Sequence, residues 1–144
     1  MFQDTVTVFN RRGEMWYPTV LENVKLIVDR ASMAARYGAQ VNDRAVVLVP
    51  LAKNENGDPA AGGKVYVTPK VWAALETPRE AVTFASGEEF DFLVAGPWPD
   101  DPVQDSDYGV RGFYDYMNRT RDEVYAVTSV SRFETLPHLE ITGR

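Results

Sequence analysis

Alternating apolar and polar positions run through most of the chain and predict a mainly β protein. Val6 and Val8 stand two apart in a run of β-branched residues, and Val24, Leu26 and Val28 repeat that spacing. A period of two puts such side chains on one face of a strand, as in a half-buried sheet. Such patterns and short apolar runs predict strands at residues 4–9, 16–21 leading into 24–28, 45–49, 64–68, 81–84, 90–94, 124–130 and 139–142.

Turn-forming residues predict hairpins at two places. Residues 53–63 are rich in Gly and Asn and carry few large apolar groups, which favours an exposed hairpin loop whose returning strand is 64–68. Residues 86–88 join the strands at 81–84 and 90–94 in the clearest hairpin of the sequence.

Helical patterns are confined to short segments. Residues 69–75 form a short helix opened by a proline, and residues 30–37 are compatible with a helix that stops at Gly38. Residues 113–117 form one turn of helix or a short strand. Few helices and regularly spaced strands predict a small β-barrel or sandwich of about seven to eight short strands, with one or two short helices and long loops. No internal repeat divides residues 1–144, so we expect a single domain.

The composition narrows the possible chemistry. The chain has 144 residues and a net charge of −6, which argues against wrapping around a nucleic-acid backbone but leaves an acidic surface past which DNA can slide. It has no cysteine, which excludes disulfides, thiolate nucleophiles and thiolate metal sites. The N-terminus lacks a basic region followed by an apolar run, so we expect neither export nor membrane insertion.

Catalytic motifs are missing from the sequence. The single histidine, His138, lies between Pro137 and Leu139, and we interpret it as a surface or interface residue. No phosphate loop or Gly-x-Ser-x-Gly motif occurs. Glu88 and Glu89, or Asp91, could pair for acid and base work, but chance pairs are expected among 21 acids. We therefore predict a protein that is not an enzyme and needs no cofactor.

A long segment, residues 96–112, interrupts the regular pattern, and long loops in compact domains are often functional. Carboxylates are the oxygen ligands that calcium prefers, but prolines interrupt this cluster and no Asp-x-Asp-x-Asp-Gly core is present. We interpret the segment as a solvated acidic loop without a metal. Its four aspartates are Asp100, Asp101, Asp105 and Asp107.

Aromatic side chains gather before Pro18 and around the acidic loop. They either anchor the core and the loops or serve as interface anchors, because Trp and Tyr are enriched at the centre of protein contacts. The interface candidates are Trp16, Tyr17, Trp98, Tyr108, Phe113, Tyr114 and Tyr116, together with His138.

Several segments resemble the head–tail joining proteins of bacteriophages and prophages, also called head-completion or stopper proteins. Residues 4–10 and 16–24 are similar to that family's opening strand, turn and Trp-containing strand. Residues 64–69 resemble its strand that runs into a proline, and residues 92–96 its strand that closes on a glycine. Two further segments, 112–118 and 137–144, look like a prophage branch of the family.

The resemblance implies a small β-barrel that joins a homo-oligomeric ring and closes the channel after DNA packaging. Its implied partners are a portal or adaptor protein above and a tail terminator or tail tube protein below, with double-stranded DNA passing without specific binding. The implied location is the virion, after assembly in the cytoplasm of a bacterial host.

The family's gating loop is an extended excursion between barrel strands. Here either the 96–112 segment or residues 53–63 could serve, the second through Asn54, Glu55, Asn56, Gly57 and Asp58. We expect the four aspartates to face the channel, where repulsion between like charges keeps DNA from adhering. The alternative is a β-barrel module that binds a small ligand or calcium through the 96–112 loop.

Overall fold

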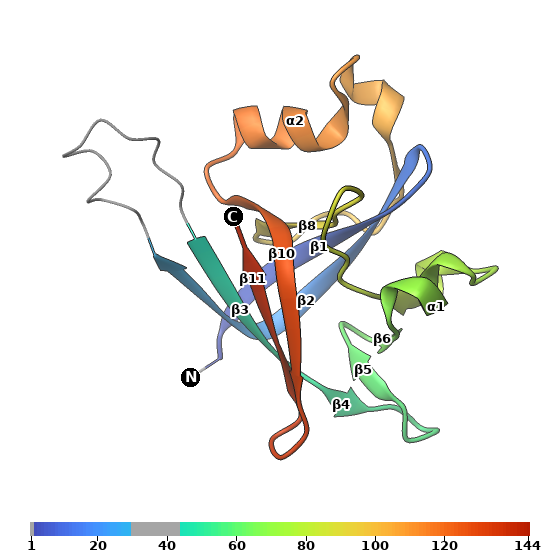
Figure 1. Cartoon of the computed structure of the whole chain (residues 1–144), viewed down its shortest axis with the longest axis vertical. Coiled ribbons are helices and arrows are strands. Elements are labelled where there is room, and N and C mark those ends of the chain that lie inside the picture. The colour runs from blue at the N-terminus through green and yellow to red at the C-terminus, as the bar shows by residue number, and fades with distance from the viewer. Residues whose placement is uncertain (1, 30–43) are drawn as a thin grey trace.

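The computed structural model describes residues 2–29 and 44–144. The predicted helix at 30–37 lies outside the described residues. Six strands form a closed barrel in the order β1-β8-β10-β11-β3-β2, with β2 pairing back to β1 (Figure 1). These strands are β1 (Asp4–Arg12), β2 (Met15–Asp29), β3 (Arg44–Pro50), β8 (Phe92–Ala95), β10 (Val124–Phe133) and β11 (His138–Gly143).

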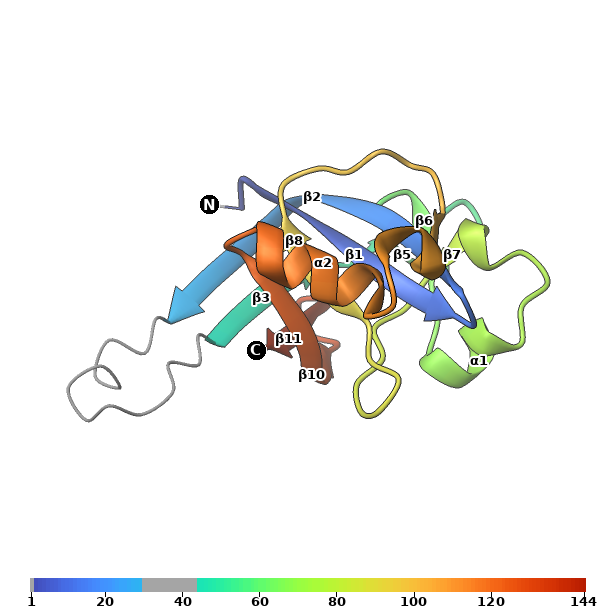
Figure 2. The ribbon, with the colours of Figure 1, turned by 90° about the horizontal axis from the view of Figure 1, so that it is seen from above.

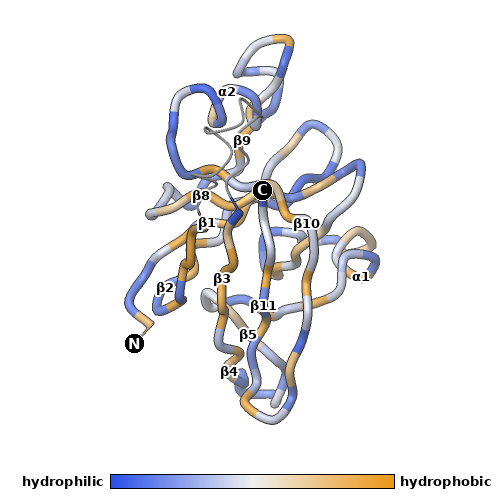
Figure 3. Tube along the Cα trace, turned by 60° about the vertical axis from the view of Figure 1, so that its left-hand side comes forward, coloured by the Kyte–Doolittle hydropathy of each residue, from blue (hydrophilic) through white to orange (hydrophobic). Residues whose placement is uncertain are grey.

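Smaller elements surround the barrel. A second sheet has the order β4-β5-β6-β7, and β9 pairs with the start of β2. The α2 helix and β9 lie at one end of the long axis, and β4 lies at the other (Figures 1 and 3). The bounds are β4 (Ala52–Lys53), β5 (Pro59–Ala61), β6 (Lys64–Tyr66), α1 (Pro69–Ala73), η2 (Pro78–Glu80), β7 (Ala81–Val82), β9 (Val103–Gln104), η3 (Asp105–Tyr108) and α2 (Gly112–Thr120).

The structure confirms the predicted fold class, a mainly β protein with a small barrel, and two short α-helices lie among the described residues. The segment predicted as a strand at 45–49 pairs with β2 on one side and β11 on the other. The two segments predicted at 16–21 and 24–28 form one 15-residue strand. Residues 113–117 belong to a helix, which settles the choice between helix and strand. No helix among the described residues is both long and apolar enough to cross a membrane.

Two hydrophobic clusters stabilise the fold, one on each side of the barrel wall. The inner cluster includes Val6, Val8, Leu21, Val24, Val47, Val49, Leu93, Leu139 and Ile141. The outer cluster comprises Phe9, Trp16, Phe92, Val94, Val103, Phe113, Met117 and Val124.

Strands β1 and β8 contribute to both clusters because successive side chains of a strand point to opposite faces. Val8 packs in the inner cluster and its neighbour Phe9 in the outer one. Leu93 and Phe92 divide in the same way on β8. The α2 helix covers the outer face and contributes Phe113, which is fully buried (Figure 2). The wall beneath α2 is therefore buried on both sides.

The hairpin predicted between 81–84 and 90–94 is wrong. β7 pairs in parallel with β6, whereas β8 pairs with β1 and β10 in the barrel. The intervening turn does close, because Ala85 and Asp91 exchange hydrogen bonds: Ala85 N–H donates to the Asp91 carboxylate and Asp91 N–H to the Ala85 carbonyl. Both flanking segments are buried, so no alternation of polar residues indicates which strands they join.

Two segments predicted as irregular contain strands. Residues 53–63 hold β5, which pairs with both β4 and β6, so the exposed turn is shorter than predicted. Residues 96–112 hold β9 and η3. These strands have only two or three residues, too few for a periodic pattern to reveal them.

Gly62, between β5 and β6, offers a test of how the small sheet sits on the barrel. Its φ is +61°, and an added Cβ would lie 2.7 Å from the Val20 carbonyl oxygen. Gly63 also has positive φ, but its Cβ would meet nothing within 4 Å. We expect Gly62→Ala to lower the free energy of unfolding by about 2 kcal/mol and Gly63→Ala by about 1 kcal/mol. Urea unfolding of both variants measures this, and equal losses would contradict the close approach to β2.

Candidate functional site

The four aspartates of the 96–112 segment do not share one environment. Asp105 turns toward the barrel, and its side chain is only 18% exposed. Its Oδ1 accepts hydrogen bonds from Trp16 Nε1 at 2.8 Å and from the Phe113 N–H at 2.9 Å. Arg11 lies 3.7 Å from Oδ2. The carboxylate thus ties β1, β2 and the start of α2 together.

These contacts favour the charged form of Asp105. Desolvation acts to raise the pKa of its carboxyl, but the hydrogen bonds from Phe113 and Trp16 and the charge of Arg11 outweigh it and lower the pKa. Gly112 completes the contact, since its φ is +87° and a Cβ there would lie 2.6 Å from an Asp105 oxygen. Asp105 therefore has a structural role. We call its carboxylate, together with the contacts to Arg11, Trp16 and Phe113, the clasp.

The other three aspartates are exposed. Arg79 lies 3.5 Å from the Asp101 carboxylate and also donates a hydrogen bond to the Asp100 carbonyl. Asp107 lies in η3, close in sequence to the clasp but exposed. Asp100, Asp101 and Asp107 therefore present their carboxylates to solvent.

The alternative channel loop, residues 54–58, is a tight turn held by hydrogen bonds to the Asn54 side chain. Asn54 Oδ1 accepts the N–H groups of Asn56 and Asp58, both at 2.9 Å, and Gly57 has φ +82°. Glu55 is exposed at the same turn. The turn follows β4, and thus lies at the opposite end of the barrel from α2 (Figure 1).

The aromatic candidates divide between core and surface. Trp16 and Phe113 are fully buried, so the prediction that they are interface anchors is wrong. Both side chains anchor the core instead. Trp98, Tyr108 and Tyr114 are partly buried and pack on the outer cluster. Tyr17 contacts the Trp72 ring, and Tyr116 is 37% exposed.

His138 opens β11 and is partly exposed. Its ring stacks on Phe133 with centroids 4.8 Å apart, and its Nδ1 lies 2.6 Å from the Leu136 carbonyl oxygen. Phe133 and Leu136 are both exposed at the tip of the β10–β11 hairpin. An interface role for His138 stays a prediction.

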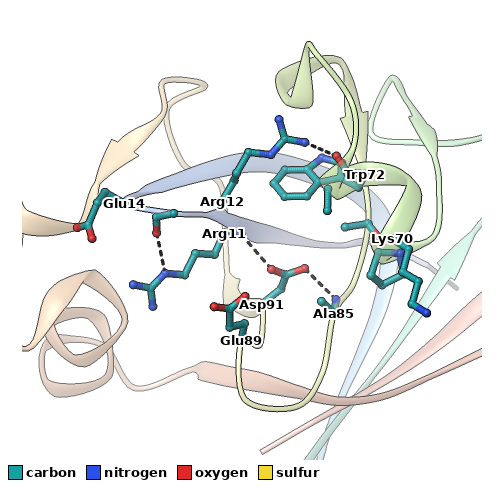
Figure 4. Close-up of a pocket in the computed structure, with 12 residues that line it drawn as sticks. Arg11, Arg12, Glu14, Lys70, Trp72, Ala85, Glu89 and Asp91 are labelled. Atoms are coloured by element: carbon teal, nitrogen blue, oxygen red, sulfur yellow. Dashed lines mark hydrogen bonds between the residues drawn. The ribbon is translucent and has the colours of Figure 1, made fainter.

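A pocket of about 610 Å³ opens between the β1–β2 turn, α1 and the segment that leads to β8 (Figure 4). We call it the Asp91 pocket. Its charged and hydroxyl-bearing lining residues are Arg11, Arg12, Glu14, Lys70, Thr83, Glu89 and Asp91.

Asp91 is the buried carboxyl group of this pocket, with 2% of its surface exposed. Its Oδ1 accepts the Arg11 N–H at 3.0 Å, and its Oδ2 accepts Ala85 N–H and Asn10 Nδ2, both at 2.8 Å. Burial raises the pKa of Asp91 to about 6, against the opposing effect of these hydrogen bonds. Asp91 forms no ion pair with any described residue.

The two arginines of the pocket are already engaged. Arg12 stacks over Trp72, 4.9 Å from the ring centroid, and donates to the carbonyls of Trp72 and Leu75. Arg11 donates from Nε to the Gly13 carbonyl and pairs with the clasp carboxylate. Two buried atoms of the lining, Thr83 Oγ1 and Arg12 Nε, have no hydrogen-bond partner among the described residues.

A family model matches residues 1–144. The chain belongs to DUF6751, a family of unknown function. No curated protein and no solved structure matches the chain.

Sequence reasoning about this DUF6751 member noted Asp91 only as one of many acids. Its signal was an acid between Phe90 and Phe92 in an otherwise apolar strand, and its partner Asn10 follows the strand predicted at 4–9. In residues 2–29 and 44–144, no three His, Cys, Asp or Glu side chains gather as a metal-ion site. The calcium alternative therefore gains no supporting observation.

Proposed function

We propose that this DUF6751 chain is a head–tail joining protein of a tailed phage or prophage, acting as one copy in a ring between the portal or adaptor and the tail. The observation that supports this most is the closed six-stranded barrel, the interior of which is filled by apolar side chains. Such a filled barrel offers a rigid body for assembly, with the loops left for contact. It is the fold that the resemblance of residues 4–10 and 16–24 implies.

The role requires no chemistry, and we infer that the protein is not an enzyme and works without a cofactor. Its buried carboxyl, Asp91, has three of its lone pairs taken by hydrogen bonds from its own chain. His138, the single histidine, stacks on Phe133 at the tip of the β10–β11 hairpin. It is not among the residues that line the Asp91 pocket. The proposed partners are the portal or adaptor and the tail terminator or tail tube, and the proposed location is the virion after assembly in the host cytoplasm.

Double-stranded DNA would pass the exposed carboxylates without binding. Asp100, Asp101 and Asp107 suit a surface that faces the channel, and a ring multiplies their field. Asp105 is no longer part of this group, because its carboxylate is held by Trp16 and Phe113. The Asn54–Asp58 turn is the alternative channel loop.

Deletion of the gene from the genome that encodes it tests the assembly role. We expect electron micrographs to show DNA-filled heads and separate tails, and a plasmid copy of the gene to restore joined particles. Genes for a portal and a tail tube should flank it. Normal virions after deletion, or a metabolic operon around the gene, would exclude the proposal.

The acidic loop has its own prediction. We expect the triple variant Asp100→Lys, Asp101→Lys, Asp107→Lys to fold normally but to slow DNA release from assembled particles severalfold, because lysines attract phosphates. The matched control is a triple asparagine variant, which removes charge without adding attraction. Release kinetics of repaired particles measure the effect, and unchanged kinetics for the lysine variant would show that the loop does not face the channel.

A further inference from the structure

The Asn54–Asp58 turn holds the pair Asn56 and Gly57 in an exposed position. It closes the β4–β5 hairpin, where Asn54 N–H donates to the Asp58 carbonyl at 2.9 Å (Figure 1). Gly57 has φ +82°, and a Cβ placed on it would meet nothing within 4 Å. The Asn56 side chain forms no hydrogen bond with any residue in 2–29 or 44–144. Its amide is therefore free to rotate toward the next peptide unit.

An asparagine that precedes a glycine can lose its side-chain amide without an enzyme. The reacting groups belong to adjacent residues, and the glycine has no Cβ to obstruct them. The Gly57 nitrogen gives up its proton and forms a bond to Asn56 Cγ, while the bond from Cγ to Nδ2 breaks and ammonia leaves with that proton. Water then opens the resulting five-membered succinimide and leaves aspartate or isoaspartate in place of Asn56.

Asn56 is the only asparagine of the sequence that precedes a glycine. The other asparagines precede Arg, Val, Asp or Glu, the side chains of which obstruct the approach of the backbone nitrogen to Cγ. The reaction should therefore be concentrated at Asn56.

The folded turn restrains this reaction. Gly57 N–H donates to the Asn54 carbonyl at 3.0 Å, so the attacking nitrogen is held in a hydrogen bond. Asn54 Oδ1 accepts the N–H groups of Asn56 and Asp58, both at 2.9 Å, and fixes the backbone on both sides of Gly57. The nitrogen becomes available only when these bonds open, and such local opening has its own free energy.

We propose that Asn56 is a site of spontaneous deamidation, the rate of which is set by the Asn54 side chain. Each conversion adds one carboxylate to a chain of net charge −6 and places it between Glu55 and Asp58. Isoaspartate also adds one carbon to the backbone, so Asn54 can no longer hold both N–H groups in the same geometry. The turn therefore changes as the protein ages. The proposal does not depend on the assembly role.

Peptide mapping of the full chain, kept folded in mildly alkaline buffer, tests the site. Trypsin cleaves after Lys53 and Lys64, so residues 54–64 form one fragment that holds both asparagines of the turn. We expect this fragment to show, with time, the mass increase of an amide turned into an acid, located at Asn56 and partly as isoaspartate. Asn118, exposed in α2, is the internal reference and should stay intact. Conversion at Asn118 as fast as at Asn56 would overturn the proposal.

Two variants test the restraint. Asn54→Ala removes the acceptor of two hydrogen bonds, so conversion at Asn56 should become about tenfold faster in the folded protein. Glu55→Ala, in the same turn, should change the rate by less than about twofold, because the Glu55 side chain forms no ion pair with any residue that the structure describes. In urea, where the turn is open, the parent and Asn54→Ala should convert equally fast. An unchanged rate for folded Asn54→Ala would overturn the proposal.

Asn56→Gln is the control for the reacting side chain. It keeps an amide but lengthens the side chain by one carbon, so the ring that must close is larger and conversion should stop. The urea unfolding curve should match that of the parent. A fragment 54–64 that gains the same mass in Asn56→Gln as in the parent would place the reaction at Asn54 and overturn the proposal. Head–tail joining is affected by none of these outcomes.

Discussion

Replacing Asp91 by alanine is expected to lower the free energy of unfolding by about 4 kcal/mol at pH 5. The substitution leaves two backbone donors, Arg11 N–H and Ala85 N–H, without an acceptor, and Asn10 Nδ2 keeps only its bond to the Thr83 carbonyl. It also removes one of the two hydrogen bonds that close the turn between β7 and β8, the one to the Asp91 carboxylate. Urea unfolding measures the loss, and Glu89→Ala, an exposed change in the same turn, should alter stability by less than about 0.5 kcal/mol.

The loss caused by Asp91→Ala should shrink at higher pH. Burial raises the pKa of Asp91 to about 6 in the folded state, above its value in the unfolded chain. The folded protein therefore holds the proton of the Asp91 carboxyl more tightly than the unfolded chain does. The resulting contribution of Asp91 to stability is full below the unfolded pKa and is lost as pH rises through about 6. Between pH 5 and pH 8 we expect the difference between parent and variant to fall by roughly 1.5 kcal/mol. A difference that is constant over this range would show that the pKa of Asp91 is not raised.

Asp105→Ala is expected to lower the free energy of unfolding by about 3 kcal/mol at neutral pH, because two charge-assisted hydrogen bonds are lost. Those bonds hold Trp16 and the first turn of α2. Tryptophan fluorescence during urea unfolding reports the change. The control is Asp107→Ala, two residues away and exposed, which should have almost no effect.

The pH dependence of this second variant runs the other way. The pKa of Asp105 is lowered in the folded state, so its contribution is present above the unfolded pKa and is lost as pH falls through the folded pKa. The difference between parent and Asp105→Ala should therefore shrink as the pH falls. An undiminished difference at pH 2 would mean that the charge of Asp105 does not hold the clasp.

Local patterns predicted the barrel strands well because each has enough residues to show a period. β1, β3, β10 and β11 all lie where alternation or β-branched runs placed them. β7 and β8 were paired wrongly because both are buried: β7 pairs in parallel with the preceding strand β6, and β8 pairs with β1 at the other end of the chain.

The candidate site was harder to predict than the fold because its contacts join distant residues. Asp91 meets Asn10 across 81 positions, and Asp105 meets Trp16 across 89. Composition grouped Asp105 with three solvent-exposed neighbours, and only the position of the Trp16 indole and the Phe113 N–H separates it from them. A residue's charge is visible in a sequence, but the donors that surround it are not.

The burial of β1 and β8 on both faces also bears on how the molecule comes apart. Phe92 belongs to one cluster and Leu93 to the other, although they are adjacent on a single four-residue strand. Neither cluster can lose that strand without exposing the other to water. The barrel and the α2 helix that covers it should therefore unfold as one cooperative unit, so that detaching α2 also destabilises the interior of the barrel.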